Sequence, residues 1–403
     1  MSTMRSIVLG CASLLSAATQ ALLPRWAGAT EEQGVPHTVS ATVGEGTTQV
    51  TSYPGHEGHQ YYERTGVLDT GKVRYAVKYC SCWDSSHGGQ AAPLEGYIGM
   101  PEPNACNWYH SGFLRVTING QDIGSTRMSD MYAGESGARG SVTMLFRAPQ
   151  ATVRVRFLAL PDDDRLFCEV GLEPTGEVTS LQIALNSYPS FFTAYLHRDG
   201  WRRVTTATRE AEQGATLELK PAEGWWIACT DDVFDPPKDE AAAGGCGLLF
   251  DPDQIQAAAV TIGSYNVAPM LTVDPAVRTI RLVFWDFNKR PNAEAIRGMR
   301  AGAESTLKLL RDIDFTPQAV TSFDLAARSA AVAAELRKVT DPADFPARFE
   351  ALRHKLAPLL ADARKARAEG RPIPVEIEKS IAGEMKAYSD LEWELRFHVL
   401  LND

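Results

Sequence analysis

Residues 53–110 contain the side chains whose types could do chemistry. Aromatic rings, histidines and short polar side chains lie there among Gly, Pro, Ser and Asn, as in long loops carried on a rigid scaffold. Aromatic rings stack on the apolar face of a sugar, while polar groups bond its hydroxyls. The alternative is that the rings fill the core and the histidines are solvated. The predicted site residues are Trp83, Asp84, Asn107 and Trp108 as ligand contacts, and His87 and His110 as hydrogen-bonding or proton-transferring groups.

An acidic pair follows the aromatic strand around Trp225. Asp231 and Asp232 precede a Pro-Pro sequence. Paired carboxylates can perform acid–base catalysis on glycosidic bonds, bind calcium or cap a loop. The spacing leaves these alternatives open, so both residues are catalytic candidates. A second acidic run, Asp162 to Asp164, is predicted to be the solvated tip of a hairpin.

The cysteines and histidines between residues 80 and 110 were also considered as zinc ligands. Cys80, Cys82 and His87 are followed by Cys106 and His110, but this spacing does not match paired zinc knuckles. The sequence therefore predicts no metal and no cofactor. A metal-dependent hydrolase remains an alternative that elemental analysis would test.

The first 29 residues have the order of a secretory signal peptide. Arg5 supplies the positive charge, residues 6–23 are uncharged and largely apolar, and Ala27-Gly28-Ala29 forms a cleavage pattern. A membrane anchor is the alternative, and a lipoprotein signal at Cys11 has too few apolar residues before it. We therefore expect an exported protein, periplasmic or extracellular, with no membrane span after cleavage.

Export would place six cysteines in an oxidising compartment, where thiols tend to pair. Cys168 alternates with apolar neighbours and is predicted to be a buried thiol. A bridge from Cys80 or Cys82 to Cys106 is the preferred pairing. The full set of disulfide candidates is Cys80, Cys82, Cys106, Cys229 and Cys246.

Charge excludes two classes of partner. The formal net charge is -10, with 40 basic and 50 acidic residues. Nucleic acid needs a basic surface, and anionic lipid attracts one. The sequence therefore predicts no nucleic-acid partner.

Hydrophobic periodicity predicts a large antiparallel β-sandwich over residues 30–290. Side chains alternate with period two, as in residues 72–80 and 153–157, and Asn119-Gly120 suits a type I′ turn between strands. Parallel strands would need helical crossovers, which are missing from this region. One large sandwich is favoured over two because no linker or internal repeat divides the region.

The period changes to that of helices over residues 291–403. Asn292 is predicted to cap the first helix, and Asp341 with Pro342 to begin a later one in which Pro358 produces a kink. The predicted fold is therefore mainly β, a supersandwich-like domain followed by a small α-helical C-terminal region. These helices could dock onto a protein partner in the cell envelope.

The strand order of residues 153–188 and 225–287, with the segment Gly244-Gly245-Cys246-Gly247-Leu248-Leu249-Phe250, resembles the galactose-mutarotase-like supersandwich. This resemblance of architecture covers about 60% of the chain. It implies epimerase, lyase or hydrolase chemistry on sugars, usually through histidine and acidic residues. The Asn-His pair of the epimerases is not present here, so no catalytic residue is transferred, and a shared fold does not establish the chemistry.

These observations together predict an exported β-sandwich protein that binds or processes carbohydrate. The alternatives are a non-catalytic structural or interaction protein of the cell envelope and the metal-dependent hydrolase. Catalysis itself is left open by the sequence.

Overall fold

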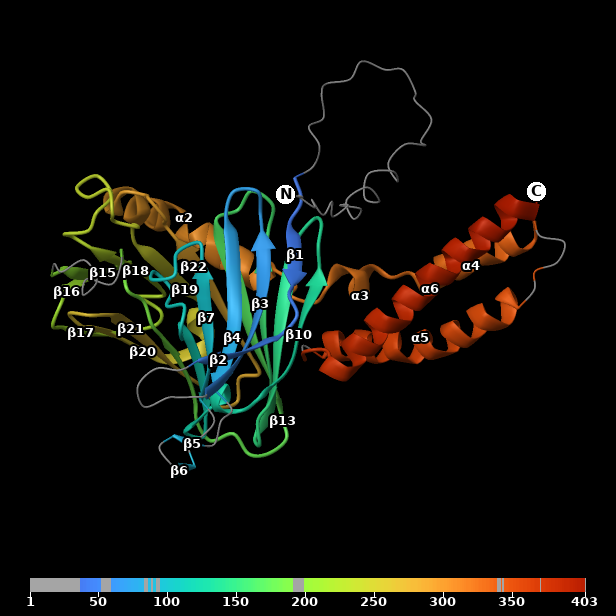
Figure 1. Ribbon diagram of the computed structural model, residues 1–403, viewed down its shortest axis with the longest axis horizontal. Coiled ribbons are helices and arrows are strands. Elements are labelled where there is room, and N and C mark those ends of the chain that lie inside the picture. Colours follow the sequence, from blue (N-terminus) through green and yellow to red (C-terminus); the bar gives the residue numbers. More distant parts are fainter. Residues whose placement is uncertain are drawn as a thin grey trace, which may run out of the picture. The chain divides into compact units, whose positions relative to one another are not determined.

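The computed structural model describes residues 37–51, 59–82, 86–87, 90–91, 95–190, 199–338, 342, 344–369 and 371–402. The predicted leader, residues 1–29, lies outside these residues. Within them, the chain forms two large antiparallel sheets followed by helices (Figure 1). A short hairpin of β5 (Ser86–His87) and β6 (Gln90–Ala91) stands apart from both sheets.

The first sheet has eleven strands among the described residues, in the order β1-β3-β4-β7-β8-β14-β21-β20-β17, with β2 on β3 and β9 on β8. All its pairings are antiparallel. Its strands are β1 (Ser40–Val43), β2 (Thr47–Thr51), β3 (His59–Asp69), β4 (Arg74–Cys82), β7 (Glu95–Glu102), β8 (Leu114–Ile118), β9 (Gln121–Asp122), β14 (Leu181–Leu185), β17 (Thr216–Leu219), β20 (Ile255–Ile262) and β21 (Val267–Val273).

The second sheet has nine strands among the described residues, in the order β10-β11-β12-β13-β22-β19-β18-β15-β16. It is also antiparallel throughout. Its strands are β10 (Met128–Glu135), β11 (Gly140–Arg147), β12 (Ala151–Ala159), β13 (Arg165–Pro174), β15 (Arg202–Thr206), β16 (Glu210–Glu212), β18 (Trp226–Asp231), β19 (Cys246–Phe250) and β22 (Thr279–Asp286).

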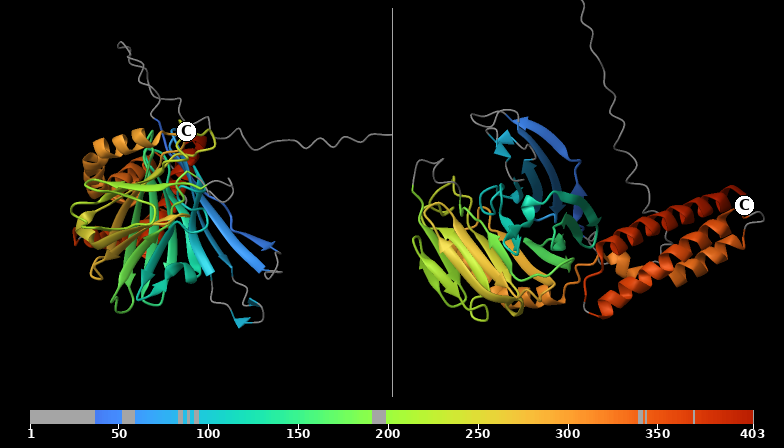
Figure 2. Two further views of the ribbon diagram at one scale, coloured as in Figure 1. Left: turned by 90° about the vertical axis from the view of Figure 1, so that its left-hand side faces the viewer. Right: turned by 90° about the horizontal axis from the view of Figure 1, so that it is seen from below.

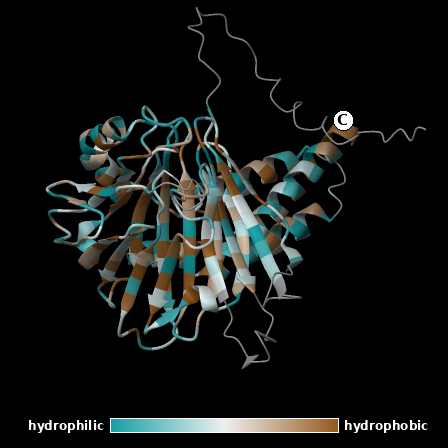
Figure 3. Ribbon diagram, turned by 60° about the vertical axis from the view of Figure 1, so that its left-hand side comes forward, coloured by the Kyte–Doolittle hydropathy of each residue, from teal (hydrophilic) through white to brown (hydrophobic). Residues whose placement is uncertain are grey.

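A single hydrophobic core joins the two sheets, so the predicted mainly β sandwich is confirmed. In β4, Tyr75, Val77 and Tyr79 are completely buried while Arg74 is exposed, as the period-two pattern predicted. Figure 3 shows hydrophobic and hydrophilic segments following one another along the strands. The core is continuous from β1 to β22, which agrees with one large sandwich rather than two.

The helices belong to two different cores. Helix α2 packs on β18, β19 and β22, and its Met299 contacts Gly247. Helices α3 to α6 share a second core, in which α5 and α6 run side by side (Figure 2). No helix among the described residues is long and apolar enough to cross a membrane. The α-helices are α2 (Asn292–Asp312), α3 (Gln318–Ser322), α4 (Leu325–Leu336), α5 (Phe345–Ala368) and α6 (Val375–Asn402), with short 3-10 helices η1 (Ile123–Ser125) and η2 (Pro252–Gln254).

Helix starts differ in detail from the prediction. Asn292 is the first residue of α2 and makes no cap; instead the Asp235 carboxylate accepts its backbone N–H at 3.0 Å. Pro358 lies inside α5, as expected. The predicted cap Asp341 lies outside the described residues. The β18–β19 connection, through Asp235, therefore fixes where α2 begins.

Helix α6 begins on the outer face of the second sheet, over a buried charge cluster. Arg154 and Arg156 of β12 are 4% and 1% exposed, and both donate to Glu378 of α6. Arg156 also donates to the carbonyl of Phe315 at 2.6 Å, and Arg154 to that of Ile373 at 3.0 Å. Burial alone would raise the pKa of Glu378, but the two guanidinium groups outweigh it and lower that pKa. The cluster thus joins the helices to the sandwich.

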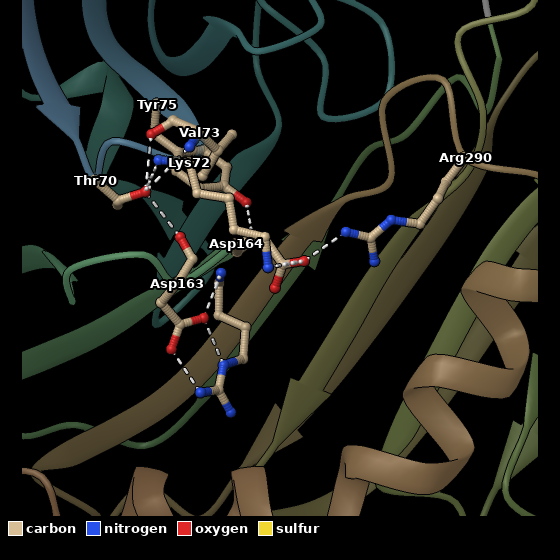
Figure 4. Close-up of polar contacts among 8 residues, drawn as sticks. Thr70, Lys72, Val73, Tyr75, Asp163, Asp164 and Arg290 are labelled. Carbon is tan, nitrogen blue, oxygen red and sulfur yellow. Dashed lines mark hydrogen bonds and ion pairs between the residues drawn. The ribbon is translucent and has the colours of Figure 1, made fainter.

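The acidic hairpin between β12 and β13 is bonded rather than freely solvated (Figure 4). Asp164 pairs with Lys72 at 3.2 Å and with Arg290 at 2.6 Å, and its carbonyl accepts the Tyr75 hydroxyl at 2.6 Å. The Thr70 hydroxyl donates to the carbonyl of Asp163 at 2.9 Å. This hairpin therefore connects the β3–β4 turn of the first sheet to the second sheet.

Candidate functional site

A cleft of about 520 Å³ lies on the outer face of the first sheet. Its wall combines phenol rings with hydrogen-bonding side chains contributed by β7, β8, β9, η1 and the segment between β7 and β8. A ligand site needs this mixture of apolar area and a few convergent polar groups. The lining residues that carry the chemistry are Tyr97, Tyr109, Ser111, Arg115, Asp122 and Asn186.

A second cavity, of about 570 Å³, lies between β10, α3 and α6. Its charged side chains are already engaged with protein partners. Lys379 pairs with Asp130, Lys386 with Asp390 at 2.6 Å, and Glu378 with the buried arginines. The cleft on the first sheet is therefore the better candidate for a polar ligand.

Two glycines of β7 permit the backbone approaches that shape the cleft. A side chain on Gly96 would overlap the carbonyl of Gly124 in η1, and one on Gly99 would overlap the carbonyl of His110. Only glycine allows another backbone to come this close to the strand. The two walls of the cleft, η1 and residues 109–112, depend on these contacts.

Arg115 and Asp122 form the polar floor of the cleft. Asn119 and Gly120 both have positive φ, as a type I′ turn requires, and the turn returns the chain from β8 to β9. Arg115 Nε then lies 2.9 Å from Asp122 Oδ2. Burial raises the pKa of Asp122, and the Gly124 amide and the Arg115 guanidinium oppose that rise. Asp122 thus offers a partly buried acceptor beside an exposed cation.

Tyr97 presents a neutral phenol to the cleft. Burial raises its pKa, and a hydrogen bond with the Cys80 thiol raises it further, while a bond with Ser111 opposes the shift. Lys78 lies 6.0 Å from the ring centre and pairs with Glu63 at 2.8 Å. The ring is therefore held in place from β4 and from the Ser111 segment.

His110 lies at the edge of the cleft, where it supports two of the lining residues. Its Nδ1 is 3.0 Å from the Ser111 hydroxyl, and its ring packs edge-on against Tyr109 at 5.0 Å. Burial lowers the pKa of His110, and the nearby charge of Lys78 lowers it further against the opposing Glu63. A neutral imidazole at neutral pH follows from these effects.

The aromatic surface continues beyond the cleft. Tyr109 packs edge-on against Tyr188 at 4.8 Å, and Tyr188 packs against Tyr265, also at 4.8 Å. Tyr265 is 46% exposed. Beside this row, Asn266 donates to the Asn186 side chain at 2.8 Å. Ring edges and amides therefore extend the polar-aromatic character across the ends of β14 and β21.

Trp108 and Asn107, two of the predicted ligand contacts, are core residues, and their predicted roles are wrong. Trp108 is completely buried, packs edge-on against Phe284 at 5.1 Å and donates to the carbonyl of Trp285 at 2.8 Å. Asn107, also completely buried, donates to Asp286 and to the carbonyl of Gly245, both at 2.9 Å. Both anchor residues 104–113 between the sheets, so that the following Tyr109 and Ser111 face the cleft.

The structure does not describe the side chains of the other predicted ligand contacts. Trp83 and Asp84 lie outside the described residues, and His87 belongs to β5 without a described side chain. They remain predictions from the sequence. Among the predicted site residues whose side chains are described, His110 is the one that lies at the cleft edge.

Asp231 and Asp232 do not form a catalytic pair. Asp231 is the last residue of β18 and Asp232 directly follows it, and successive side chains along a strand point to opposite faces of the sheet. Asp231 is completely buried and pairs with Arg202, and its Oδ1 accepts the amide of Phe234 at 2.9 Å. Asp232 pairs at the surface with Arg203 at 2.8 Å. Each carboxylate therefore has a structural partner of its own.

The predicted disulfides are not supported: among the described residues no two cysteines lie at disulfide distance, and all six described cysteines are buried. Cys80 and Cys82 face outward from β4, where Cys80 bonds Tyr97, while Cys106 lies in the turn anchored between the sheets. Cys229 and Cys246 are opposite each other in β18 and β19, and Cys246 donates to the carbonyl of Asn107 at 3.3 Å. Cys168 is completely buried, as predicted.

Asp286, which bonds Asn107, should make stability depend on pH. Burial raises its pKa from 3.8 to about 7, against the hydrogen bonds from Asn107 and the Asn288 backbone. Between these values the unfolded chain loses a proton that the folded chain keeps, so stability falls as pH rises. The difference between the two pKa values corresponds to a change in the free energy of unfolding on the order of 4 kcal/mol.

We expect Asp286→Asn to be mildly destabilising near pH 4 and to become progressively more favourable toward pH 8, measured by urea unfolding at each pH. Unmade hydrogen bonds of the new amide reduce the gain by about 1–3 kcal/mol. The exposed Asp253→Asn is the matched control and should show no gain in stability as pH rises, because it removes a carboxylate that pairs with Arg311. A flat difference for Asp286→Asn would contradict the buried-carboxyl explanation.

Sequence reasoning missed Arg115, Asp122 and Asn186. Arg115 alternates with buried Leu114 and Val116, so its outward direction was readable from the sequence. The side chains beside it in the cleft were not readable from the sequence. Strand β14, for example, pairs with β8 only across about 60 residues of intervening chain. Within the described residues, no group of three His, Cys, Asp or Glu side chains is arranged to hold a metal ion.

Comparison with known proteins finds likeness only in structure. No protein-family model matches this sequence, and no curated protein sequence matches it. A Klebsiella pneumoniae protein assigned as an aldose 1-epimerase aligns with 68% of this chain and 96% of its own, at 10% identity and a TM-score of 0.33. The GH36 α-galactosidase AgaB of Geobacillus stearothermophilus aligns over 55% of this chain and 39% of its own, at 11% identity and a TM-score of 0.31. The likeness is one of architecture, as the predicted resemblance was.

Proposed function

We propose that this chain is an exported protein that binds carbohydrate in the cleft on the first sheet. The observation that carries the proposal is the convergence of phenol rings and charged or amide groups around one space of about 520 Å³. A sugar ring has apolar faces and a rim of hydroxyls, so it needs both kinds of contact at once. Export is supported by the signal-peptide pattern of residues 1–29.

The cleft assigns separate roles to its residues. Tyr97 and Tyr109 supply ring surface, and both phenol rings are held by neighbours within the protein. Arg115 donates to hydroxyl or ring oxygens, while Asp122 accepts from hydroxyls. The Asn186 amide can do both, since it carries a donor and an acceptor. The Tyr188–Tyr265 row extends the surface toward a second sugar unit.

Replacing Tyr109 with alanine should weaken carbohydrate binding at least about tenfold, a change of about 1.4 kcal/mol. The reason is loss of ring surface, which Tyr109→Phe retains. The measurement is a screen of the purified protein on a glycan array, followed by titration calorimetry of each variant with the tightest-binding soluble glycan.

Trp201→Ala is the matched control, because Trp201 is an exposed ring before β15, away from the cleft, and its removal should leave binding unchanged. If Tyr109→Ala binds as tightly as the natural protein, this cleft is not the site. If no glycan binds in the screen, the carbohydrate assignment itself fails. Export is tested separately, by N-terminal sequencing of the mature protein, which should begin at Thr30.

A further inference from the structure

The last four turns of α6 are apolar on two opposite faces. One face, with Tyr388, Leu391, Leu395 and Val399, is buried against α4 and α5. The other face is open. Its large apolar side chains are Trp393, Phe397, Leu400 and Leu401, between 60% and 76% exposed, and we call them the α6 stripe.

The α6 stripe has the spacing of a helix-packing surface. Residues 393, 397, 400 and 401 stand at i, i+4, i+7 and i+8, so they lie along one side of the helix. A helix that is apolar all round is normally buried all round. Leu400 is 22 residues beyond Glu378, about 33 Å along the helix at 1.5 Å per residue, so the charge cluster on the sandwich does not reach the stripe.

We propose that the α6 stripe pairs with the same stripe of a second copy of this chain, in an antiparallel arrangement. A twofold axis between residues 396 and 397 places Trp393 opposite Leu400 of the second copy, and Arg396 opposite Phe397. Arg396 already lies over the Trp393 ring at 5.2 Å, so its guanidinium is positioned among aromatic rings. Such a surface is self-complementary, as a twofold interface requires.

The exposed apolar area of the stripe indicates which class of interface this pairing would form. Two aromatic and two leucine side chains at these exposures offer roughly 500 Å² per copy, or about 1,000 Å² in a dimer. Interfaces of that size are at the low end for specific association and are reversible. We therefore expect a dimer that dissociates on dilution, and the micromolar range is where it is sought.

Charge disfavours a lipid surface as the occupant. Asp390, Glu392 and Glu394 near the stripe are each paired with a basic side chain, so the stripe carries no excess of positive charge beyond Arg396, and the whole chain carries a formal net charge of -10. Anionic membranes attract basic segments, not acidic ones. Pairing with a second copy does not depend on opposite net charges, because both copies bring the same few charged residues to the twofold interface.

Analytical ultracentrifugation of the full chain between about 1 and 100 µM tests the proposal. The weight-average mass should rise from monomer toward dimer over this range. Trp393→Glu and Phe397→Glu should raise the dissociation constant at least tenfold and leave the circular dichroism spectrum unchanged, since both side chains are exposed. Trp201→Glu, at an exposed tryptophan away from the helices, should dimerise like the natural protein.

A monomer at 100 µM would overturn the proposal, and so would a dimer that persists in both α6 variants. Sedimentation with vesicles of phosphatidylcholine and phosphatidylglycerol is the second measurement. Vesicle binding by a protein that stays monomeric, lost in Trp393→Glu, would assign the stripe to a membrane instead.

Discussion

Glu378→Ala should lower the free energy of unfolding by about 3–5 kcal/mol. The carboxylate is 3% exposed and is the shared acceptor for Arg154 and Arg156, which are themselves buried. Its removal leaves two guanidinium charges in a low-dielectric site without their counter-ion. The measurement is urea unfolding followed by circular dichroism, with limited proteolysis at the start of α6 as a local readout.

Glu376→Ala is the matched control for this cluster. Glu376 stands two residues earlier on α6 and pairs with Arg147, but both side chains are more than half exposed. Exposed pairs contribute about 0–1 kcal/mol, so this variant should be nearly neutral. Equal losses for the two variants would show that burial does not decide the strength of the cluster.

Trp108→Ala should also cost about 3–5 kcal/mol, the range for removing a large aromatic side chain from a core. The indole is enclosed by Phe113 and Phe284 and donates to the carbonyl of Trp285. Its loss leaves a cavity between the sheets and a carbonyl without its donor. Thermal or urea unfolding measures the effect.

Tyr109→Ala provides the contrast at the next position in the chain. Tyr109 is only half-buried at the cleft, so its removal should cost less stability than that of Trp108 while weakening carbohydrate binding. Stability and binding should therefore separate between adjacent residues. If Trp108→Ala unfolds like the natural protein, the indole is not part of the core.

The strands could be predicted because their pattern is local. Residues 153–157 were expected as a strand and lie in β12, and Asn119-Gly120 was expected as a type I′ turn and has positive φ at both residues. Turn chemistry and period-two alternation act over a few residues, so the sequence shows them directly. The helix start at Asn292 was less predictable, because its backbone bonds to Asp235, 57 residues away.

The candidate site could be predicted only in outline. The aromatic segment before His110 does contribute Tyr97 and Tyr109 to the cleft, yet Trp108 between them is core. In a turn anchored between two sheets, one side chain can point into the core while its neighbour points to the surface. Hydrophobic periodicity does not show which side chain does which. Arg115, Asp122 and Asn186 join them through strand order, which pairs β8 with β7, β9 and β14.

The sequence by itself determined an antiparallel β region followed by amphipathic helices, because alternation and helical spacing are properties of neighbouring residues. Only the tertiary structure decided what covers each face. Arg154 and Arg156 have the alternation of solvent-facing residues, and they are buried because α6 lays Glu378 over them. The rings and acids that were candidates from the sequence are divided between core, ion pairs and cleft. The physical reason is that burial and pairing depend on which distant segments come together, and composition alone does not encode that.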